Sequence, residues 1–209
     1  MPFYVIDPIP VLLIGAGGHC KSCINLVDSI LEYEVQGIID RAGSSAKEVL
    51  GHKVLGTDDE MESLFGDSPS VMISVGQIKT PQTRIKLFEI ANSLGAVFPV
   101  LKSPTSCVSD HSSISSGTAV FHHVIVNASA RIGENCILNN KALIEHDAII
   151  GSHCHISTGA LINGGVLIED GCFVGSGAVL HEGIKVGENA VISAGQIVRK
   201  DVPSNTIVK

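Results

Sequence analysis

The most regular feature of this sequence is an aliphatic residue at every sixth position of its second half. Sixteen consecutive positions spaced in this way hold Val, Ile or Leu. A run of this length does not arise by chance, and it indicates a solenoid built from short repeats. The positions are Val108, Ile114, Val120, Val126, Ile132, Leu138, Ile144, Ile150, Ile156, Ile162, Ile168, Val174, Leu180, Val186, Ile192 and Val198.

A second set of positions, four residues after each aliphatic one, holds mostly small residues. This hexapeptide pattern predicts one short strand and a turn per unit, with three units closing a triangular coil. We expect about five coils over residues 101–209, stacked about 4.8 Å apart as a parallel β-helix. Cys136, Cys154 and Cys172 recur after each complete coil. They are expected to stack inside the coils as small apolar residues.

Residues 1–100 follow a different pattern, in which short apolar runs alternate with helical periodicity. We expect the first helix to continue through Leu31. The last helix is expected to be capped by Thr80, with Pro81 at its first position. Strands that alternate with helices predict a small parallel α/β sheet, and therefore a Rossmann-like domain. The expected strands are residues 11–14, 35–39 and 71–75.

A glycine-rich loop, Gly15-Ala16-Gly17-Gly18-His19, joins the first strand to the first helix. Backbone N–H groups at the start of a helix favour phosphate, and an acidic residue after the second strand can accept from ribose hydroxyls. The domain is short and Cys20 replaces the third glycine of the dinucleotide motif, so one nucleotide is favoured over NAD. A tight turn without a ligand is the alternative. The expected nucleotide-sugar contacts are Gly15, Gly17, Gly18, His19, Asp40, Arg41 and Gly76.

Composition and charge narrow the classes of function. The formal net charge is −7 and there is no basic run, which argues against nucleic acid or an anionic membrane as a partner. No apolar stretch approaches the ~18 residues of a membrane span and no signal sequence is recognisable, so we expect a cytoplasmic protein with reduced cysteines. Cys20 and Cys23 form a single CxxC without further ligands, so no metal site is expected.

The repeat departs from its small-residue pattern at Asn139 and at the run Glu145-His146-Asp147. A carboxylate bonded to one ring nitrogen of a histidine leaves the other nitrogen free to act as a base. His155 follows nine residues later, half a coil away. It should therefore lie on another face, and a site that uses both histidines must combine two subunits. Gly164 stands one coil after His146, where its N–H could meet a thioester carbonyl.

The glycine loop, Ile144-Glu145-His146-Asp147 and His153-Cys154-His155-Ile156-Ser157 together resemble the bacterial sialic acid O-acetyltransferase and nucleotide-amino-sugar N-acetyltransferase family. The resemblance covers nearly the whole chain. It implies a left-handed β-helix, homotrimers with active sites between subunits, and acetyl-CoA as co-substrate. The implied catalytic residues are His146 as general base, Asp147 as the group that raises its basicity, Glu145, and Asn139 beside the reacting centre. The implied acetyl-CoA contacts are His155 from the neighbouring subunit, the Gly164 backbone, Ser176 and Ala194.

The C-terminus departs from the family pattern. Family members commonly continue beyond the Val-Pro turn with a Gly-x-Pro-Ala-Lys segment that contacts CoA, whereas this sequence runs from Val202-Pro203 only to Lys209. We therefore expect either that CoA is held mainly by the groove between coils or that its affinity is reduced.

The sequence thus predicts an acetyl-CoA-dependent N-acetyltransferase that acts on a UDP-linked 4-amino sugar for bacterial surface glycan synthesis. A GDP-linked acceptor and O-acetylation of sialic acid remain open. A non-catalytic nucleotide-sugar-binding trimer is a further alternative. Trimeric zinc carbonic anhydrases share the repeat, but their two histidine ligands five residues apart have no equivalent among the histidines from His111 to His181.

Overall fold

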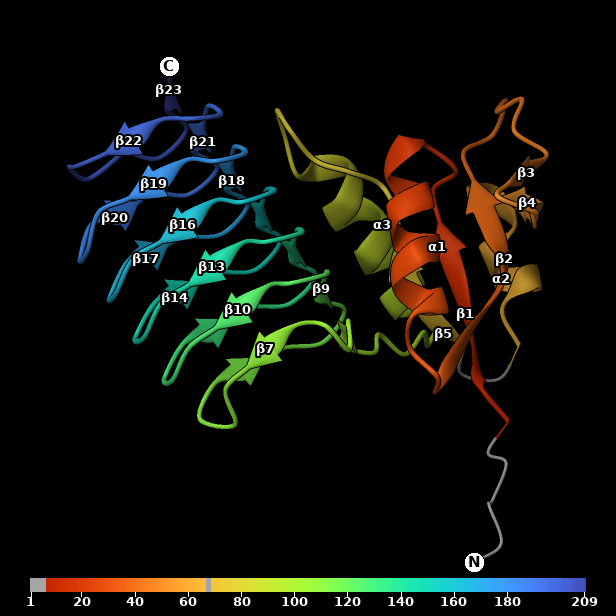
Figure 1. The fold of residues 1–209 in the computed structure, drawn as a ribbon. Coiled ribbons are helices and arrows are strands. Elements are labelled where there is room, and N and C mark those ends of the chain that lie inside the picture. The colour runs from red at the N-terminus through yellow and green to blue at the C-terminus, as the bar shows by residue number, and fades with distance from the viewer. Residues whose placement is uncertain (1–6, 67–68) are drawn as a thin grey trace, which may run out of the picture.

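The computed structural model describes residues 7–66 and 69–209, which form an α/β domain followed by a β-helix (Figure 1). In the α/β domain a five-stranded sheet has the order β3-β4-β2-β1-β5. Its strands are parallel except that β3 pairs antiparallel with β4. The elements are β1 Ile9–Ile14, α1 Gly18–Asp28, β2 Tyr33–Asp40, β3 Glu48–Val49, β4 His52–Thr57, a 3-10 turn Asp58–Glu60, α2 Met61–Leu64, β5 Ser70–Ile73 and α3 Gln82–Ser93.

The predicted strands and helices of this domain are present, with two errors at helix boundaries. Helix α1 ends at Asp28, and Leu31 lies beyond it with 94% of its surface exposed. The apolar spacing failed there because the chain turns before Leu31 can reach the buried face. Helix α3 begins at Gln82, so its N-cap is Pro81 and not Thr80 as predicted, although the Thr80 hydroxyl still accepts from the Gln82 amide at 3.4 Å.

Residues from Leu101 onward form a β-helix of short parallel strands in three sheets, seen as a ladder in Figure 1. Each strand pairs with the one a full coil later, so the hexapeptide prediction is confirmed. The first sheet holds β7 Cys107–Val108, β10 Ile125–Val126, β13 Leu143–Ile144, β16 Leu161–Ile162, β19 Val179–Leu180 and β22 Ile197–Val198. The second holds β8 Ser113–Ile114, β11 Arg131–Ile132, β14 Ile149–Ile150, β17 Leu167–Ile168 and β20 Lys185–Val186. The third holds β6 Leu101–Lys102, β9 Ala119–Val120, β12 Ile137–Leu138, β15 His155–Ile156, β18 Phe173–Val174, β21 Val191–Ile192 and β23 Ile207–Val208.

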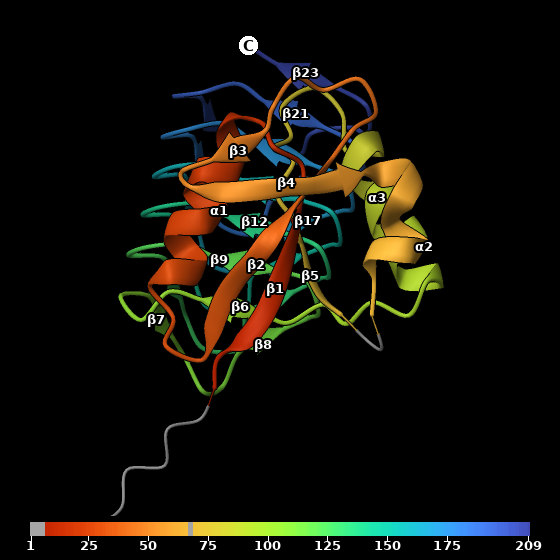
Figure 2. The same cartoon turned by 90° about the vertical axis from the view of Figure 1, so that its right-hand side faces the viewer.

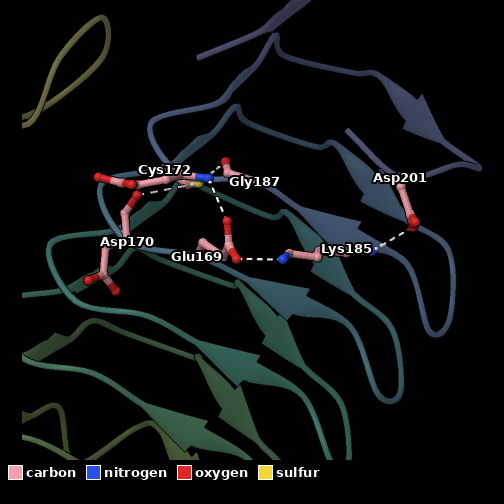
Figure 3. A network of polar contacts seen from close by, with 7 residues as sticks. Glu169, Asp170, Cys172, Lys185, Gly187 and Asp201 are labelled. Atoms are coloured by element: carbon pink, nitrogen blue, oxygen red, sulfur yellow. Dashed lines mark hydrogen bonds and ion pairs between the residues drawn. The ribbon is translucent and has the colours of Figure 1, made fainter. Parts of the chain in front are cut away.

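The interior of the β-helix is filled by the aliphatic residues and by the small residues at its corners. Cys136, Cys154 and Cys172 are fully buried, as the packing interpretation predicted. The Cys172 thiol donates to the Gly187 carbonyl oxygen at 3.1 Å, which uses a carbonyl of the next coil (Figure 3). These thiols therefore pack as small side chains and satisfy backbone acceptors of the coil beyond.

Polar side chains on the surface also link successive coils. Lys185 Nζ lies 2.6 Å from Glu169 Oε1, and the Lys185 amide donates to Asp201 at 2.9 Å (Figure 3). Such exposed contacts contribute little to stability, because water and salt screen them. The apolar interior is thus the main source of stability in this half of the chain.

The α/β domain covers one face of the β-helix, the outer side of the third sheet. Helices α1 and α3 lie between the α/β sheet and the β-helix (Figure 1), and they flank the strands when the molecule is turned (Figure 2). One continuous apolar cluster joins the two domains, from Leu26 on α1 to Phe121 in the β-helix. None of the helices in the described residues is long and apolar enough to cross a membrane.

Candidate active site

A cavity of about 1130 Å³ lies at the carboxyl edge of the α/β sheet. The ends of β1, β2 and β5 and the start of α1 line it, and α3 closes one side. His155 is the only lining residue from the β-helix among the described residues. All seven residues that the sequence suggested for a nucleotide sugar line this cavity, namely Gly15, Gly17, Gly18, His19, Asp40, Arg41 and Gly76.

The glycine loop at the start of α1 has a shape that depends on glycine. Gly15 has φ +114°, and a Cβ there would lie 2.5 Å from Val75 Cγ2. Gly17 is the N-cap of α1, and no side chain caps this end of the helix. A Cβ added at Gly17 would meet no atom within 4 Å. The helix N-terminus therefore presents free N–H groups to the cavity, which suits a phosphate.

Asp40 holds this loop in place. Its Oδ1 accepts from the Ala16 amide at 3.1 Å. Partial burial acts to raise the pKa of Asp40, but hydrogen bonds from Ser44 and from the Ala16 amide outweigh it and lower that pKa overall. The carboxylate is therefore ionised at neutral pH and retains acceptor capacity toward the cavity.

His19 and His155 form the inner end of the cavity, with ring centroids 6.1 Å apart. Burial, followed by the charge of nearby Arg84, lowers the pKa of His19 to about 3. Burial also lowers the pKa of His155 to about 4, although a hydrogen bond to the Gln77 backbone opposes the shift. Both rings are therefore neutral at physiological pH.

The tautomer of His155 follows from its partners. Its Nδ1 lies 2.7 Å from the Gln77 carbonyl oxygen, which can only accept, so Nδ1 carries the proton. Nε2 is left as an acceptor, 3.4 Å from the Asn139 amide nitrogen. The structure thus brings Asn139 together with His155, one coil apart, rather than with His146.

His146 occupies the corner between the first and second sheets, which is the corner opposite the face covered by the α/β domain. Its Nδ1 lies 2.8 Å from Asp147 Oδ2, and 66% of its side chain is exposed. The hydrogen bond to Asp147 raises the pKa of His146 above its ordinary value. With the Nδ1 proton bonded to Asp147, Nε2 of the neutral ring is free to take a proton.

Gly164 lies directly beneath the His146 ring, as the spacing of one coil predicts. A Cβ at Gly164 would be 2.8 Å from both Cε1 and Nε2 of His146. Within the described part of the chain the Gly164 amide donates to no acceptor, whereas the neighbouring Gly165 amide donates to the His146 carbonyl. An unpaired N–H therefore lies beside the imidazole.

Glu145 does not complete a pair of carboxylates around the imidazole. Its Oε2 accepts from Asn127 at 2.8 Å and lies 3.4 Å from the His146 amide nitrogen. In sequence Glu145 and Asp147 flank His146 equally, but His146 and Asp147 form the turn at the corner, where Asp147 has φ +61°, so the two carboxylates are not placed symmetrically about the ring. Only Asp147 contacts the ring.

The residues expected to contact acetyl-CoA do not form one cluster within a single chain. Ser176 and Ala194 lie on the corner between the third and first sheets, where Ser176 Oγ is 3.0 Å from Ser157 Oγ. Gly164 lies with His146 on the corner between the first and second sheets, and His155 lies on the covered face. A site that contains all of them needs two copies of the chain.

Two further residues at the domain boundary were not indicated by the sequence. Arg84 on α3 is fully buried, and within residues 7–66 and 69–209 it bonds only to oxygen atoms without formal charge, among them Val75 O at 2.7 Å and Asn135 Oδ1 at 2.7 Å. Gln77 donates across the boundary to the Gly171 carbonyl at 3.0 Å. Gln77 directly follows Gly76 at the end of a predicted strand, which is the only sequence signal that favours it.

Comparison with known proteins gives the following similarities. Residues 10–90 match the PglD N-terminal domain, residues 129–164 the bacterial transferase hexapeptide (six repeats), and residues 165–200 the hexapeptide repeat of succinyl-transferase. Among curated protein sequences no relative matches. The structure of PerB from Caulobacter crescentus, in complex with CoA and GDP-perosamine, is 30% identical, with 95% of this chain and 92% of that chain covered and a TM-score of 0.87.

This chain belongs to the hexapeptide-repeat sugar acetyltransferase family. The acetyltransferase domain of PglB from Neisseria gonorrhoeae, in complex with acetyl coenzyme A, is 28% identical over 96% of both chains with a TM-score of 0.87. WeeI from Acinetobacter baumannii shares the fold at 24% identity over 96% of both chains, with a TM-score of 0.84. The acetyltransferase therefore has the left-handed β-helix and the acetyl-CoA-dependent class that the sequence predicted.

Proposed function

We propose that this acetyltransferase transfers an acetyl group from acetyl-CoA to the amine of a nucleotide-linked amino sugar, in the cytoplasm, for surface glycan synthesis. The observation that carries the proposal is the His146–Asp147 pair above the unpaired amide of Gly164. The cavity at the glycine loop supports a nucleotide-borne acceptor. PerB, the relative at 30% identity, was crystallised with CoA and GDP-perosamine, which favours the same substrate class.

The proposed chemistry is direct acyl transfer with no covalent enzyme intermediate. Nε2 of neutral His146 takes a proton from the sugar amine as its nitrogen attacks the thioester carbonyl carbon. The Gly164 N–H donates to the oxygen that becomes negative in the tetrahedral intermediate. The carbon–sulfur bond then breaks, and the imidazolium returns its proton to the CoA thiolate. Asp147 stabilises the imidazolium through the 2.8 Å contact with Nδ1.

The site is proposed to lie between two subunits of a homotrimer. His146 stands on the corner opposite the cavity of its own chain, so the base that serves each cavity comes from a neighbouring copy. The outer side of the first sheet supports such an assembly, because an apolar stripe there is partly exposed and remains uncovered by the described residues. The stripe comprises Ile125, Leu143, Leu161, Val179 and Ile197.

The activity is tested by thiol release from acetyl-CoA with UDP- and GDP-linked 4-amino sugars, free sialic acid and a control without acceptor. We expect release that depends on an amino-sugar acceptor. His146→Ala is expected to lower kcat at least ~100-fold without loss of the assembly, as removal of a general base does. Release with sialic acid alone would replace N-acetylation by O-acetylation, and a small effect of His146→Ala would remove the histidine from its role.

The shared site is tested by complementation between two inactive variants. His146→Ala lacks the base, whereas Gly17→Asp places a carboxylate where phosphate should bind. Asp is a favourable N-cap residue, so the second variant should fold. In an equal mixture, half of the cavities belong to His146→Ala chains and are intact, and half of the bases belong to Gly17→Asp chains and are intact. Both are intact at about a quarter of the sites, so we expect about a quarter of wild-type activity. Sites within single chains would give no recovery.

A further inference from the structure

Two adjacent cations, Arg199 and Lys200, lie on the same corner of the β-helix as the proposed base His146. They are the only adjacent pair of Lys or Arg residues in the sequence. Strands β13, β16, β19 and β22 pair in this order, each one coil beyond the last, and Figure 1 shows them stacked toward the C-terminus. The corner after β13 carries His146 and the corner after β22 carries the two cations, so three coils separate them.

The turn that carries these cations is tighter than the equivalent turns of the earlier coils. Val202 pairs with Val186, which precedes it by two residues fewer than a complete coil contains. The turn after β22 is therefore made only by Arg199, Lys200 and Asp201. The Asp201 carboxylate accepts from a backbone amide of β20 at 2.9 Å (Figure 3). Both basic side chains are exposed, and neither forms an ion pair within residues 7–66 and 69–209, so both charges are available to an anion.

The proposed reaction fixes where one end of the co-substrate lies. The thioester carbonyl meets the Gly164 amide beside the His146 ring, so the sulfur atom of CoA lies at this level of the corner. The uncharged pantetheine arm joins that sulfur to the diphosphate through about 13 bonds, which span roughly 15 Å when extended, as a little over four peptide units do. Glu182 occupies the corner one coil beyond Gly164, at the level of this arm. The phosphates of an extended CoA therefore lie beyond Glu182.

Arg199 and Lys200 lie at the distance that the arm requires. Two coils separate Gly164 from Lys200, which is about 10 Å at about 4.8 Å per coil, and an extended lysine side chain adds roughly 6 Å. In the opposite direction the same corner carries Ala128 and then Asp110, whose negative charge repels phosphate. The corner therefore directs the phosphate end of CoA toward the C-terminal coils.

We infer that Arg199 and Lys200 bind the diphosphate of acetyl-CoA and hold the co-substrate along this corner. The inference rests on the proposed function, because it takes the site at His146 as the position of the thioester. A guanidinium presents paired N–H donors to phosphate oxygens and an ammonium adds a compact charge, so the two side chains complement two linked phosphates. These contacts are equal before and during acyl transfer, so they raise the affinity for CoA without accelerating the chemical step.

The test compares the double variant Arg199→Gln, Lys200→Gln with the wild-type assembly. Glutamine keeps a polar side chain and removes the charge. Acetyl transfer is measured with three donors: acetyl-CoA, acetyl-dephospho-CoA, which keeps the diphosphate but lacks the 3′-phosphate, and acetylpantetheine, which lacks every phosphate. We expect KM for acetyl-CoA and acetyl-dephospho-CoA to rise about ten-fold while kcat stays within about two-fold. The kcat/KM for acetylpantetheine should stay within about two-fold of the wild type, because this donor has no phosphate to lose.

Arg131→Gln is the matched control, because it removes an exposed cation from the second sheet. Arg131 pairs with Ile149 of the following coil, so it lies on the N-terminal side of the level of His146, away from the proposed path of CoA. All three donors should serve this variant as they serve the wild type. Equal losses with all three donors, a loss that spares acetyl-dephospho-CoA, or an unchanged KM for acetyl-CoA in the double variant would overturn the inference. Absence of transfer by the wild type with every donor and acceptor would instead reject the proposed function.

Discussion

The contact between Gly164 and the imidazole of His146 allows the base to be displaced without being removed. In Gly164→Ala the new methyl group would lie 2.8 Å from both Cε1 and Nε2 of the ring. The φ of Gly164 is outside the left-handed region, so alanine fits the backbone without strain. The substitution therefore keeps the Gly164 N–H and places its new atoms against the ring.

The size of the displacement follows from ordinary contact distances. Carbon atoms in contact lie about 3.5–4.0 Å apart, so the ring must withdraw by roughly 0.7–1.2 Å. His146 is largely exposed and can move at little cost to the fold. A misplacement of about 1 Å in a reacting group can lower a rate on the order of 10²-fold. We expect kcat to fall about 10- to 100-fold while the free energy of unfolding changes by less than about 0.5 kcal/mol.

Steady-state acetyl transfer and a denaturant titration measure these two quantities. Gly66→Ala is the matched control, because its Cβ would meet nothing within 4 Å and its φ is also outside the left-handed region. That variant should behave as the wild type does. If Gly164→Ala kept full kcat, then His146 would not act from the position seen here, and the assignment of the base would fail.

Two further outcomes are expected. Asp147→Asn weakens the interaction that raises the pKa of His146, so that pKa should fall. Because the base must be neutral, the acidic limb of the kcat/KM–pH profile should then move to lower pH. If the limb does not move, Asp147 does not raise the basicity of His146. Arg84→Met removes a buried cation, whose pKa burial lowers to about 10, together with its bonds to carbonyl groups of both domains. We expect the unfolding free energy to drop by about 3 kcal/mol and the melting temperature by roughly 6–12 °C. If a calorimetric scan shows no shift in melting temperature, the two domains dock without the help of Arg84.

Periodicity accounts for what the sequence predicted correctly. The stacking of Gly164 on His146 follows from their separation by one coil, and the grouping of Gly17 with Asp40 follows from the parallel order of β1 and β2. Both depend on local repeats or on neighbouring strands, which leave a pattern in the chain.

The features that the sequence did not predict depend on contacts between distant segments. Arg84 looks like an ordinary exposed helix residue until Asn135, 51 positions later, closes over it. Gln77 becomes distinctive only through its contact with Gly171, 94 positions away. Residues whose role is fixed by docking of one domain on another carry no periodic signal, so only the folded structure identifies them.

The three-sided coil also limits how the length of this protein can change during evolution. Loss of six residues before Asn139 would carry His155 from the third sheet to the second, away from Gln77, and His146 to a different corner. Loss or gain of a complete coil would leave each later side chain on its original face. We therefore expect related chains to differ by whole coils in this region, and by shorter steps only beyond the last coil that forms the site.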